Sequence, residues 1–201
     1  MRTLMVLEMV SLDGVMQAPG GREEDTRGGF THGGWSAPYN DAVKMQVMGE
    51  GMSRGADLLF GRWTYEKMHK VWAGRTDNPF TAVFERSQKY VASRTLKAPL
   101  PWVKSTLLEG DAADAVAQLK QEPGLDLLVM GSGTLARSLM RRGLVDRYQL
   151  LIHPLVLGSG RRLFDDGVPC SELRLVSSVP TTTGVIIATY EPADRAAPAE
   201  V

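Results

Sequence analysis

The sequence predicts one α/β domain of three layers, in which helices cover both faces of a mostly parallel central sheet with an antiparallel C-terminal edge. The first observation is that short apolar runs alternate with helical patterns as far as about Val145. Residues 125–130, for example, are apolar apart from Asp126, as is typical of a central strand covered on both faces. The second observation is that the apolar runs after Val145 follow one another without helices between them, which indicates antiparallel strands.

The first half of the chain alternates between strands and helices around one glycine-rich loop. Pro38 suits the first turn of a helix because that position needs no N–H group. Residues 19–35 are too long, polar and rich in glycine for a plain connector, which indicates a mobile binding loop or a lid. In order, the expected elements are a strand over 3–10, a helix from Pro38 to about Met52, a strand over 56–60, a helix over 64–71, a helical or irregular piece over 79–86, a strand over 89–92 and a brief strand at 102–103.

The second half of the chain contains two helices and then only strands. Asp111 is placed to cap the first helix, and Gly143 stops the second after the basic residues Arg141 and Arg142. In order, the expected elements are a helix over 111–121, a strand over 125–130, a helix opening at Thr134, and strands over 148–157, 172–179 and 185–191. Residues 1–191 are therefore expected to form one domain, and residues 192–201 a disordered tail.

The composition argues against several classes of function. The 23 Lys and Arg residues balance the 23 Asp and Glu residues, which gives no support for binding to nucleic acids or membrane surfaces. The single cysteine, Cys170, cannot form an internal disulfide, and the three histidines lack ligand spacing, so no metal site is predicted. Glu8 interrupts the apolar run 4–7, so the N-terminus indicates a first strand and not a secretion signal. No apolar run approaches the roughly 20 residues of a membrane span, and we expect a cytoplasmic protein.

Three strand ends run into turns of the same chemistry. The turns 61–64, 93–95 and 131–135 are rich in Gly, Ser, Thr and Arg, and two of them open helices. Ligands bind beyond the carboxyl ends of strands in open α/β sheets, so the three turns can converge on one crevice. Together they offer backbone N–H groups, helix N-termini and two guanidinium groups, which suit the pyrophosphate and the 2′-phosphate of NADPH. The predicted cofactor-binding residues are Gly61, Arg62, Trp63, Thr64, Ser93, Arg94, Thr95, Gly131, Ser132, Gly133, Thr134 and Leu135.

Each turn taken singly also has a plainer interpretation. Residues 131–136 fit the pattern G-x-G-x-x-A, which alone is a weak signal and is also found in Rossmann folds. An arginine in a turn, such as Arg62 or Arg94, is often a solvated charge. The hypothesis of a cofactor site therefore depends on the coincidence of three similar turns.

Six motifs that span residues 10–160 extend this interpretation. They are Val-Ser-Leu-Asp-Gly at 10–14, Gly-Arg-Trp-Thr-Tyr-Glu at 61–66, Val-Ala-Ser-Arg-Thr-Leu at 91–96, Gly-Ser-Gly-Thr-Leu at 131–135, Gly-Leu-Val-Asp at 143–146 and Pro-Leu-Val-Leu-Gly-Ser-Gly at 154–160. In these motifs and their order the chain resembles the dihydrofolate reductase superfamily, and more closely the branch with the reductase domain of riboflavin biosynthesis. Within that branch a basic residue usually follows Leu-Asp-Gly, where this chain has Val15.

The resemblance implies a dihydrofolate reductase-like fold that binds NADPH in the crevice. It implies that Gly61, Arg62 and Thr64 hold phosphates, that Ser93 and Arg94 hold the 2′-phosphate, and that residues 131–134 cover the pyrophosphate. The nicotinamide would lie near the first strand and the turn at 11–14.

The resemblance also suggests residues for the substrate half of the site. In dihydrofolate reductases a carboxylate on the first long helix grips the pterin ring, and Asp41 is the candidate here. A solvated charge at the start of the helix is the alternative for Asp41. Asp13 is a second candidate proton source, with turn chemistry as its alternative. Trp35 and Tyr39, together with Trp63 and Trp72, could form walls for a flat heteroaromatic substrate.

The function expected from these residues is an NADPH-dependent reductase that transfers a hydride to a small pterin-, pyrimidine- or related heterocyclic substrate. Two alternatives stay open, namely an NADP(H)-binding module without turnover and a 5-amino-6-(5-phosphoribosylamino)uracil-type reductase of riboflavin biosynthesis. No nucleic-acid or membrane partner is expected. The apolar strand before the turn at 157–160 could pair across a homodimer, with a monomer as the other alternative.

Overall fold

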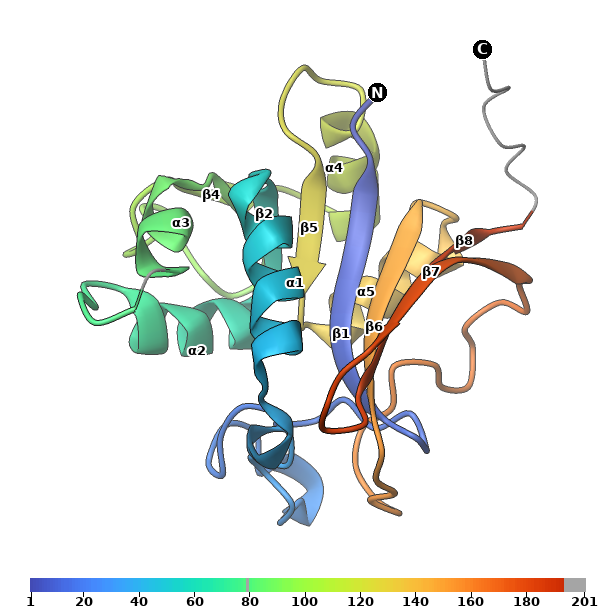
Figure 1. Cartoon of the computed structure of the whole chain (residues 1–201). Coiled ribbons are helices and arrows are strands. Elements are labelled where there is room, and N and C mark those ends of the chain that lie inside the picture. Colours follow the sequence, from blue (N-terminus) through green and yellow to red (C-terminus); the bar gives the residue numbers. More distant parts are fainter. Residues whose placement is uncertain (79, 194–201) are drawn as a thin grey trace.

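One sheet of eight strands runs through the described residues, 1–78 and 80–193, of the computed structural model (Figure 1). In spatial order the strands are β4 (Ser105–Leu108), β3 (Lys89–Ala92), β2 (Asp57–Gly61), β5 (Leu127–Met130), β1 (Leu4–Ser11), β6 (Arg147–His153), β8 (Ile186–Pro192) and β7 (Leu173–Pro180). The first six strands in this spatial order, from β4 through β1 to β6, run parallel to one another. Strand β8 is antiparallel to both of its neighbours, β6 and β7. The predicted mostly parallel sheet with an antiparallel C-terminal edge is confirmed.

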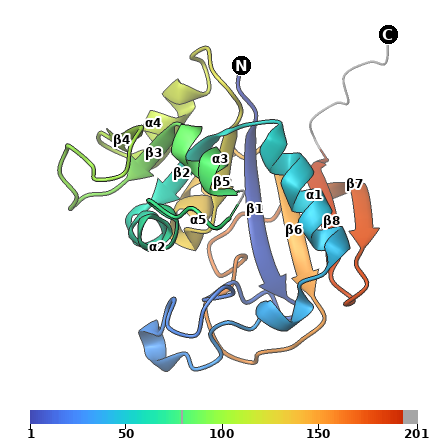
Figure 2. The same cartoon turned by 60° about the vertical axis from the view of Figure 1, so that its left-hand side comes forward.

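Helices cover both faces of this sheet, as Figures 1 and 2 show. The helices are η1 (Arg27–Gly29), η2 (Ala37–Tyr39), α1 (Ala42–Ser53), α2 (Arg62–Trp72), α3 (Phe80–Arg86), α4 (Ala112–Leu119) and α5 (Gly133–Arg141). Successive residues of a strand point to opposite faces, and β2 shows this directly. Leu58 and Phe60 pack in the core under α1, α2 and α3, whereas Leu59 packs under α4 and α5.

Local sequence signals explain where several helices begin and end. Asp41 caps α1, because its Oδ1 accepts a hydrogen bond from the backbone N–H of Lys44 at 2.8 Å. Asp111 caps α4 in the predicted way by accepting from the N–H of Ala113 at 2.9 Å. After α5, Gly143 adopts a positive φ of 62°, the left-handed conformation in which many helices end.

Two predicted strands differ from the structure, and the backbone explains both differences. Residues 102–103 form a bend, because the N–H of Trp102 donates to the Tyr65 hydroxyl at 3.0 Å instead of to a neighbouring strand. Strand β6 ends at His153 and not at Leu157, since Pro154 has no N–H group to continue the ladder.

Strand β6 also lies inside the sheet, paired with β1 on one side and β8 on the other. It cannot pair across a homodimer, which corrects that expectation. Within the described residues the two edges of the sheet are β4 and β7.

Pro192, the first residue of the predicted tail 192–201, belongs to β8. Residues 194–201 lie outside the described residues. Among the residues described, no helix is long and apolar enough to cross a membrane.

Candidate functional site

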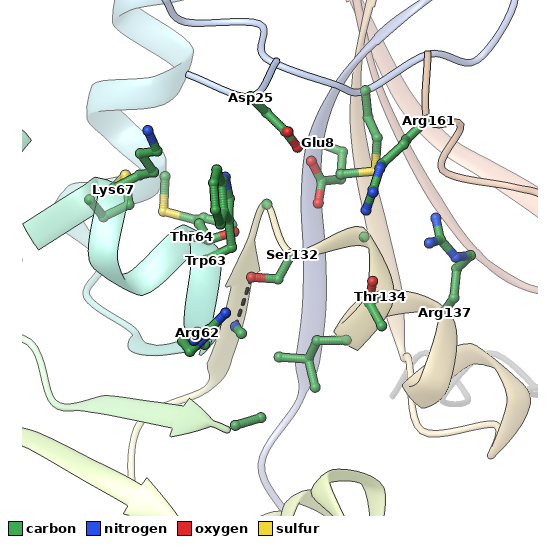
Figure 3. Close-up of a pocket in the computed structure, with 18 of the residues that line it drawn as sticks. Glu8, Asp25, Arg62, Trp63, Thr64, Lys67, Ser132, Thr134, Arg137 and Arg161 are labelled. Carbon is green, nitrogen blue, oxygen red and sulfur yellow. Dashed lines mark hydrogen bonds between the residues drawn. The ribbon is translucent and has the colours of Figure 1, made fainter. Parts of the chain in front are cut away.

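A cavity of about 1460 Å³ opens beyond the carboxyl ends of β2, β3 and β5. Its walls are residues 7–9 of β1, the first turns of α2 and α5, residues 92–94 after β3, and the loop over 16–27 (Figure 3). Ligand pockets of drug-sized molecules usually measure roughly 300–1000 Å³. The cavity therefore has room for a dinucleotide together with a small second molecule.

The starts of α2 and α5 lie side by side at the centre of the cavity. The hydroxyl oxygen of Ser132, the residue before α5, accepts a hydrogen bond at 2.7 Å from the N–H of Gly61, the residue before α2 (Figure 3). Neither helix start has a capping side chain, in contrast to the capped starts of α1 and α4. Two uncapped helix N-termini with their positive dipole ends make a site for an anion.

The backbone between these helix starts takes a form that most side chains would disturb. Gly131 has a φ of +70°, and a Cβ atom there would lie 3.1 Å from Cγ2 of Thr64. Ser132 follows with a φ of 68°, a left-handed conformation that is uncommon outside glycine and concentrates at functional sites. A glycine at 131 thus keeps the backbone of the turn close to α2 and open to the cavity.

Basic side chains outnumber acidic ones in the cavity wall by nine to five, although the whole chain has no net charge. Arg27, Arg137 and Arg142 form ion pairs with Asp25, Asp165 and Asp114 respectively. Among the residues described, Arg62 and Arg94 form no ion pair. Both are exposed in the cavity wall beside the ends of β2 and β3, and a guanidinium group can bind a phosphate with two hydrogen bonds.

The structure brings eleven of the twelve predicted cofactor-binding residues to the cavity wall, all except Thr95. The backbone N–H of Thr95 instead donates to Oγ of Ser93 at 3.1 Å, which shapes the turn that presents Arg94. The N–H of Gly61 is bound to Ser132 and is therefore not a free donor for a phosphate. The donor set that is left, two helix starts and two unpaired arginines, fits the three phosphates of NADPH.

The candidate proton donors Asp13 and Asp41 do not line the cavity. Asp13 accepts from the Ser11 hydroxyl at 2.6 Å and from the N–H groups of Leu157 and Gly158, and these bonds lower its pKa to about 2. Asp13 therefore ties the turn at 11–14 to the loop that follows β6. That turn does not line the cavity either, unlike residues 7–9 of the first strand.

Asp41 connects the start of α1 to the turn between β7 and β8. Its carboxylate accepts from the hydroxyl and the N–H of Thr182, both at 2.6 Å, and from the N–H of Thr183. The hydroxyl of Thr182 is the largest cause that lowers the pKa of Asp41 to about 2. A carboxylate held in this way is ionised at neutral pH, and it lies outside the cavity wall.

The aromatic residues Trp35 and Tyr39 also lie outside the cavity wall. Both pack edge-on against the buried His153, with ring centroids 5.0 and 5.6 Å away. The indole N–H of Trp35 donates to the carbonyl oxygen of Gln17 at 2.7 Å, which anchors the glycine-rich loop. Trp63 and Trp72, the other two aromatic residues named as candidate walls, do line the cavity.

Trp63, in the first turn of α2, adds an aromatic ring to the cavity wall. The guanidinium carbon of Arg27 lies 4.2 Å from the centroid of a Trp63 ring, and Nζ of Lys67 lies 5.1 Å from it. The loop that carries Arg27 is held by the buried Gln17 side chain, which donates to the carbonyl oxygens of Asp25 and Arg27. These bonds therefore hold residues 16–27 together as one wall of the cavity.

Glu8 is the residue of the cavity that the sequence prediction did not include. Its side chain is 4% exposed, and Oε1 has no hydrogen-bond partner among the described residues. Burial raises the pKa of the Glu8 carboxyl well above its usual value, and the nearby charge of Glu24 raises it further. A signal was present in the sequence, because Glu8 alternates with Leu4, Val6 and Val10, whose side chains pack in the core.

No group of His, Cys, Asp or Glu within 1–78 and 80–193 is arranged to hold a metal ion.

Comparisons with known proteins agree with this geometry. The family model of the RibD C-terminal domain matches residues 2–187. The uncharacterized protein YyaP of Bacillus subtilis is 29% identical over 141 residues, which cover 66% of this chain and 72% of YyaP.

Two solved structures share the fold over nearly the whole chain. A putative riboflavin biosynthesis protein from Shewanella sp. PV-4 superposes with a TM-score of 0.65 at 20% identity, covering 94% of this chain and 98% of that protein. Dihydrofolate reductase from Enterococcus faecalis, solved in complex with NADP(H), superposes with a TM-score of 0.61 at 15% identity, covering 96% and 97%.

Proposed function

We propose a function from one established premise: this chain belongs to the RibD C-terminal domain family. The family consists of NAD(P)H-dependent reductases. We infer that this chain is an NADPH-dependent reductase that transfers a hydride to a small pterin-, pyrimidine- or related heterocyclic substrate. The observation that carries the proposal is the pair of uncapped helix starts, tied together by Ser132 and Gly61, at the centre of a cavity large enough for a dinucleotide.

The phosphate-binding end of the cavity supplies the binding energy in this proposal. The N–H groups in the first turns of α2 and α5 would hold the pyrophosphate, with Arg62 as a cationic partner. Arg94 would pair with the 2′-phosphate. The Ser93 hydroxyl accepts two backbone hydrogen bonds and lies 3.5 Å from the Thr95 hydroxyl, and it would donate its own proton to the same phosphate.

The other end of the cavity would position the acceptor. NADPH supplies a hydride when it is bound. Trp63, whose ring Arg27 and Lys67 already contact, would give the acceptor an aromatic wall. The loop over 16–27, fastened by Gln17, would keep water away from the reacting atoms. The work of the chain is thus to orient two bound molecules and to exclude water.

Calorimetric titration with NADPH and NADH, followed by a turnover assay, tests this proposal. We expect saturable NADPH binding that is tighter than NADH binding, and NADPH oxidation with a member of a panel of pterins, aminouracils and quinones. Tight NADPH binding with no oxidation by any acceptor would support the NADP(H)-binding module instead. A cavity that binds neither cofactor would refute both.

A 5-amino-6-(5-phosphoribosylamino)uracil-type reductase is the more specific alternative. It is supported by the family and by the name of the Shewanella protein of the same fold. Val15, where that branch usually has a basic residue, argues against it. Turnover of this phosphoribosyl substrate in preference to substrates without a phosphate would decide for it.

A further inference from the structure

Glu8 occupies a position that the sheet itself opens to the cavity. The last residue of β5, Met130, pairs with Leu7 of β1, so β5 ends one residue before Glu8. On its other side Glu8 pairs with Leu150 of β6. The turn at Gly131 then leaves the sheet toward α5, and the Glu8 side chain faces the space that this departure creates. Figure 3 shows its carboxyl group directed into the cavity.

A buried carboxyl group with one unpartnered oxygen destabilises the fold unless a ligand supplies the missing partner. Glu8 lies on the core face of β1 between Val6 and Val10, where an apolar residue would pack without loss. Its Oε1 atom has no hydrogen-bond partner among residues 1–78 and 80–193, although the side chain is almost fully buried. Buried polar atoms in proteins are nearly always bonded, so an orphaned one that faces a cavity points to a ligand atom as its partner.

We propose that Glu8 is the catalytic acid of this site: its carboxyl group contacts the heterocyclic acceptor and donates a proton to it. The proposal rests on the reductase function proposed above, and it names the residue that completes the reaction. It also narrows the acceptor to a ring that presents a C=N nitrogen or a C=O oxygen at its edge, because a neutral carboxylic acid needs a hydrogen-bond acceptor opposite its O–H group.

Burial and a neighbouring carboxylate favour the protonated form of Glu8. Burial is the largest cause that raises its pKa, and the nearby Glu24 adds to the effect. The backbone of Gly131 and the guanidinium group of Arg137 on α5 act in the opposite direction.

Other charged groups of the same wall belong to three different elements. They are Asp25 in the glycine-rich loop, Lys67 on α2 and Arg161 in the loop after β6, and Asp25 and Arg161 attract each other electrostatically. Glu24, whose pKa is also raised by burial, accepts hydrogen bonds from the N–H groups of Gly20 and Gly21. Among the described residues of this wall, Glu8 is thus the carboxyl group with a buried oxygen that has no hydrogen-bond partner.

The proton transfer balances in atoms and electrons. The hydride adds to the carbon of the C=N or C=O bond, and the π electrons of that bond move to the nitrogen or oxygen. There they form a new bond to the Glu8 proton as the O–H bond of Glu8 breaks. The acceptor has then gained two electrons and two hydrogen atoms, the reductant has lost a hydride, and the Glu8 carboxylate takes up a proton from solvent.

The first test does not depend on a substrate. The carboxyl carbons of ¹³C-labelled glutamate are followed by NMR from acidic to alkaline pH in the wild type and in Glu8→Gln, which identifies the Glu8 signal by its loss. We expect the Glu8 carboxyl to titrate above the usual range of glutamate side chains, and Glu66→Gln, at an exposed position, serves as the matched control for the signal assignment. A Glu8 signal that titrates with the exposed glutamates would overturn the proposal, because the group would then be ionised at neutral pH.

The second test compares binding with turnover. Glu8→Gln keeps the size of the side chain but cannot release a proton, so we expect NADPH binding to be retained and kcat/KM with a dihydropterin or aminouracil acceptor to fall by about 10²–10⁴-fold. The wild-type kcat/KM should decrease as pH rises through the NMR midpoint of Glu8, and this step should vanish in the variant.

The outcomes separate this proposal from the one on which it rests. A wild type that binds NADPH and turns over, with a Glu8→Gln variant of equal kcat/KM, would overturn the role of Glu8 alone. A wild type that does not bind NADPH would overturn the proposed reductase, whatever the titration of Glu8.

Discussion

Replacement of Arg94 by alanine tests the assignment of the cofactor most selectively. Arg94 is exposed at the rim of the cavity directly after β3, and no ion pair with a described residue holds it. Its removal should therefore change the free energy of unfolding by less than about 0.5 kcal/mol. A charge-assisted contact with the 2′-phosphate would be lost, and such contacts contribute about 1–3 kcal/mol.

This energy corresponds to roughly 5- to 150-fold weaker NADPH binding. NADH carries no 2′-phosphate, so its Kd should be almost unchanged in Arg94→Ala. The assay is calorimetric titration of both cofactors at low and at high salt, because a contact at an exposed charge is screened by ions. We expect the selectivity for NADPH over NADH to shrink by the same factor as the NADPH affinity.

Lys97 offers a matched control for the loss of a positive charge. It is exposed in the same loop, three residues after Arg94, but does not line the cavity. Lys97→Ala should leave both Kd values unchanged. If Arg94→Ala weakens NADPH and NADH equally, or if Lys97→Ala reproduces its effect, the assignment of Arg94 to the 2′-phosphate is wrong.

Three further predictions follow from the same contacts. Gly131→Ala should weaken NADPH and NADH binding equally, because the added methyl group would lie 3.1 Å from Thr64 at the start of α2. Gly143→Ala is the control, because Gly143 has the same left-handed backbone conformation but no atom within 4 Å of its Cβ position. This change should lower only the free energy of unfolding, by about 1 kcal/mol. Asp41→Ala should lower the melting temperature, because it removes the cap of α1 and the hydrogen bonds to the turn after β7, and the Kd of the cofactor should stay unchanged. A variant with a normal melting temperature and no turnover would contradict this prediction. Because the pKa of Glu8 is raised in the folded protein, the free energy of unfolding of the wild type should fall as pH rises above about 4.5. The total loss should be about 1.4 kcal/mol for each unit by which folding raises this pKa. Urea titrations of Glu8→Gln at the same pH values should lack this fall.

The sequence predicted best what depends on neighbouring residues in the chain. Strand β3 has the predicted bounds, Asp111 caps α4, and Gly143 ends the segment after α5 in the expected left-handed conformation. The three turns that line the cavity could also be located, because each follows from a strand and the carboxyl ends of parallel strands meet at one edge.

The substrate half could not be predicted because it depends on tertiary contacts. Whether Trp35 and Tyr39 face a ligand or the buried His153 is decided by how the glycine-rich loop folds back, and no local pattern reports this. Asp41 is engaged by Thr182, a residue 141 positions away in the chain. In the sequence, Glu8 is marked only as a charged residue at a position of the first strand where apolar residues alternate. Whether its side chain faces the cavity depends on where the neighbouring strand β5 ends.

A crystal structure of the protein grown with NADPH tests the central claim most directly. We predict the pyrophosphate at the N-termini of α2 and α5, the 2′-phosphate within hydrogen-bonding distance of Arg94, and the nicotinamide beside residues 7–9 with the Glu8 carboxyl group at the open side of the ring. A pyrophosphate bound away from the turn at Gly131 and Ser132, or a nicotinamide at the opposite end of the cavity from Glu8, would contradict the account.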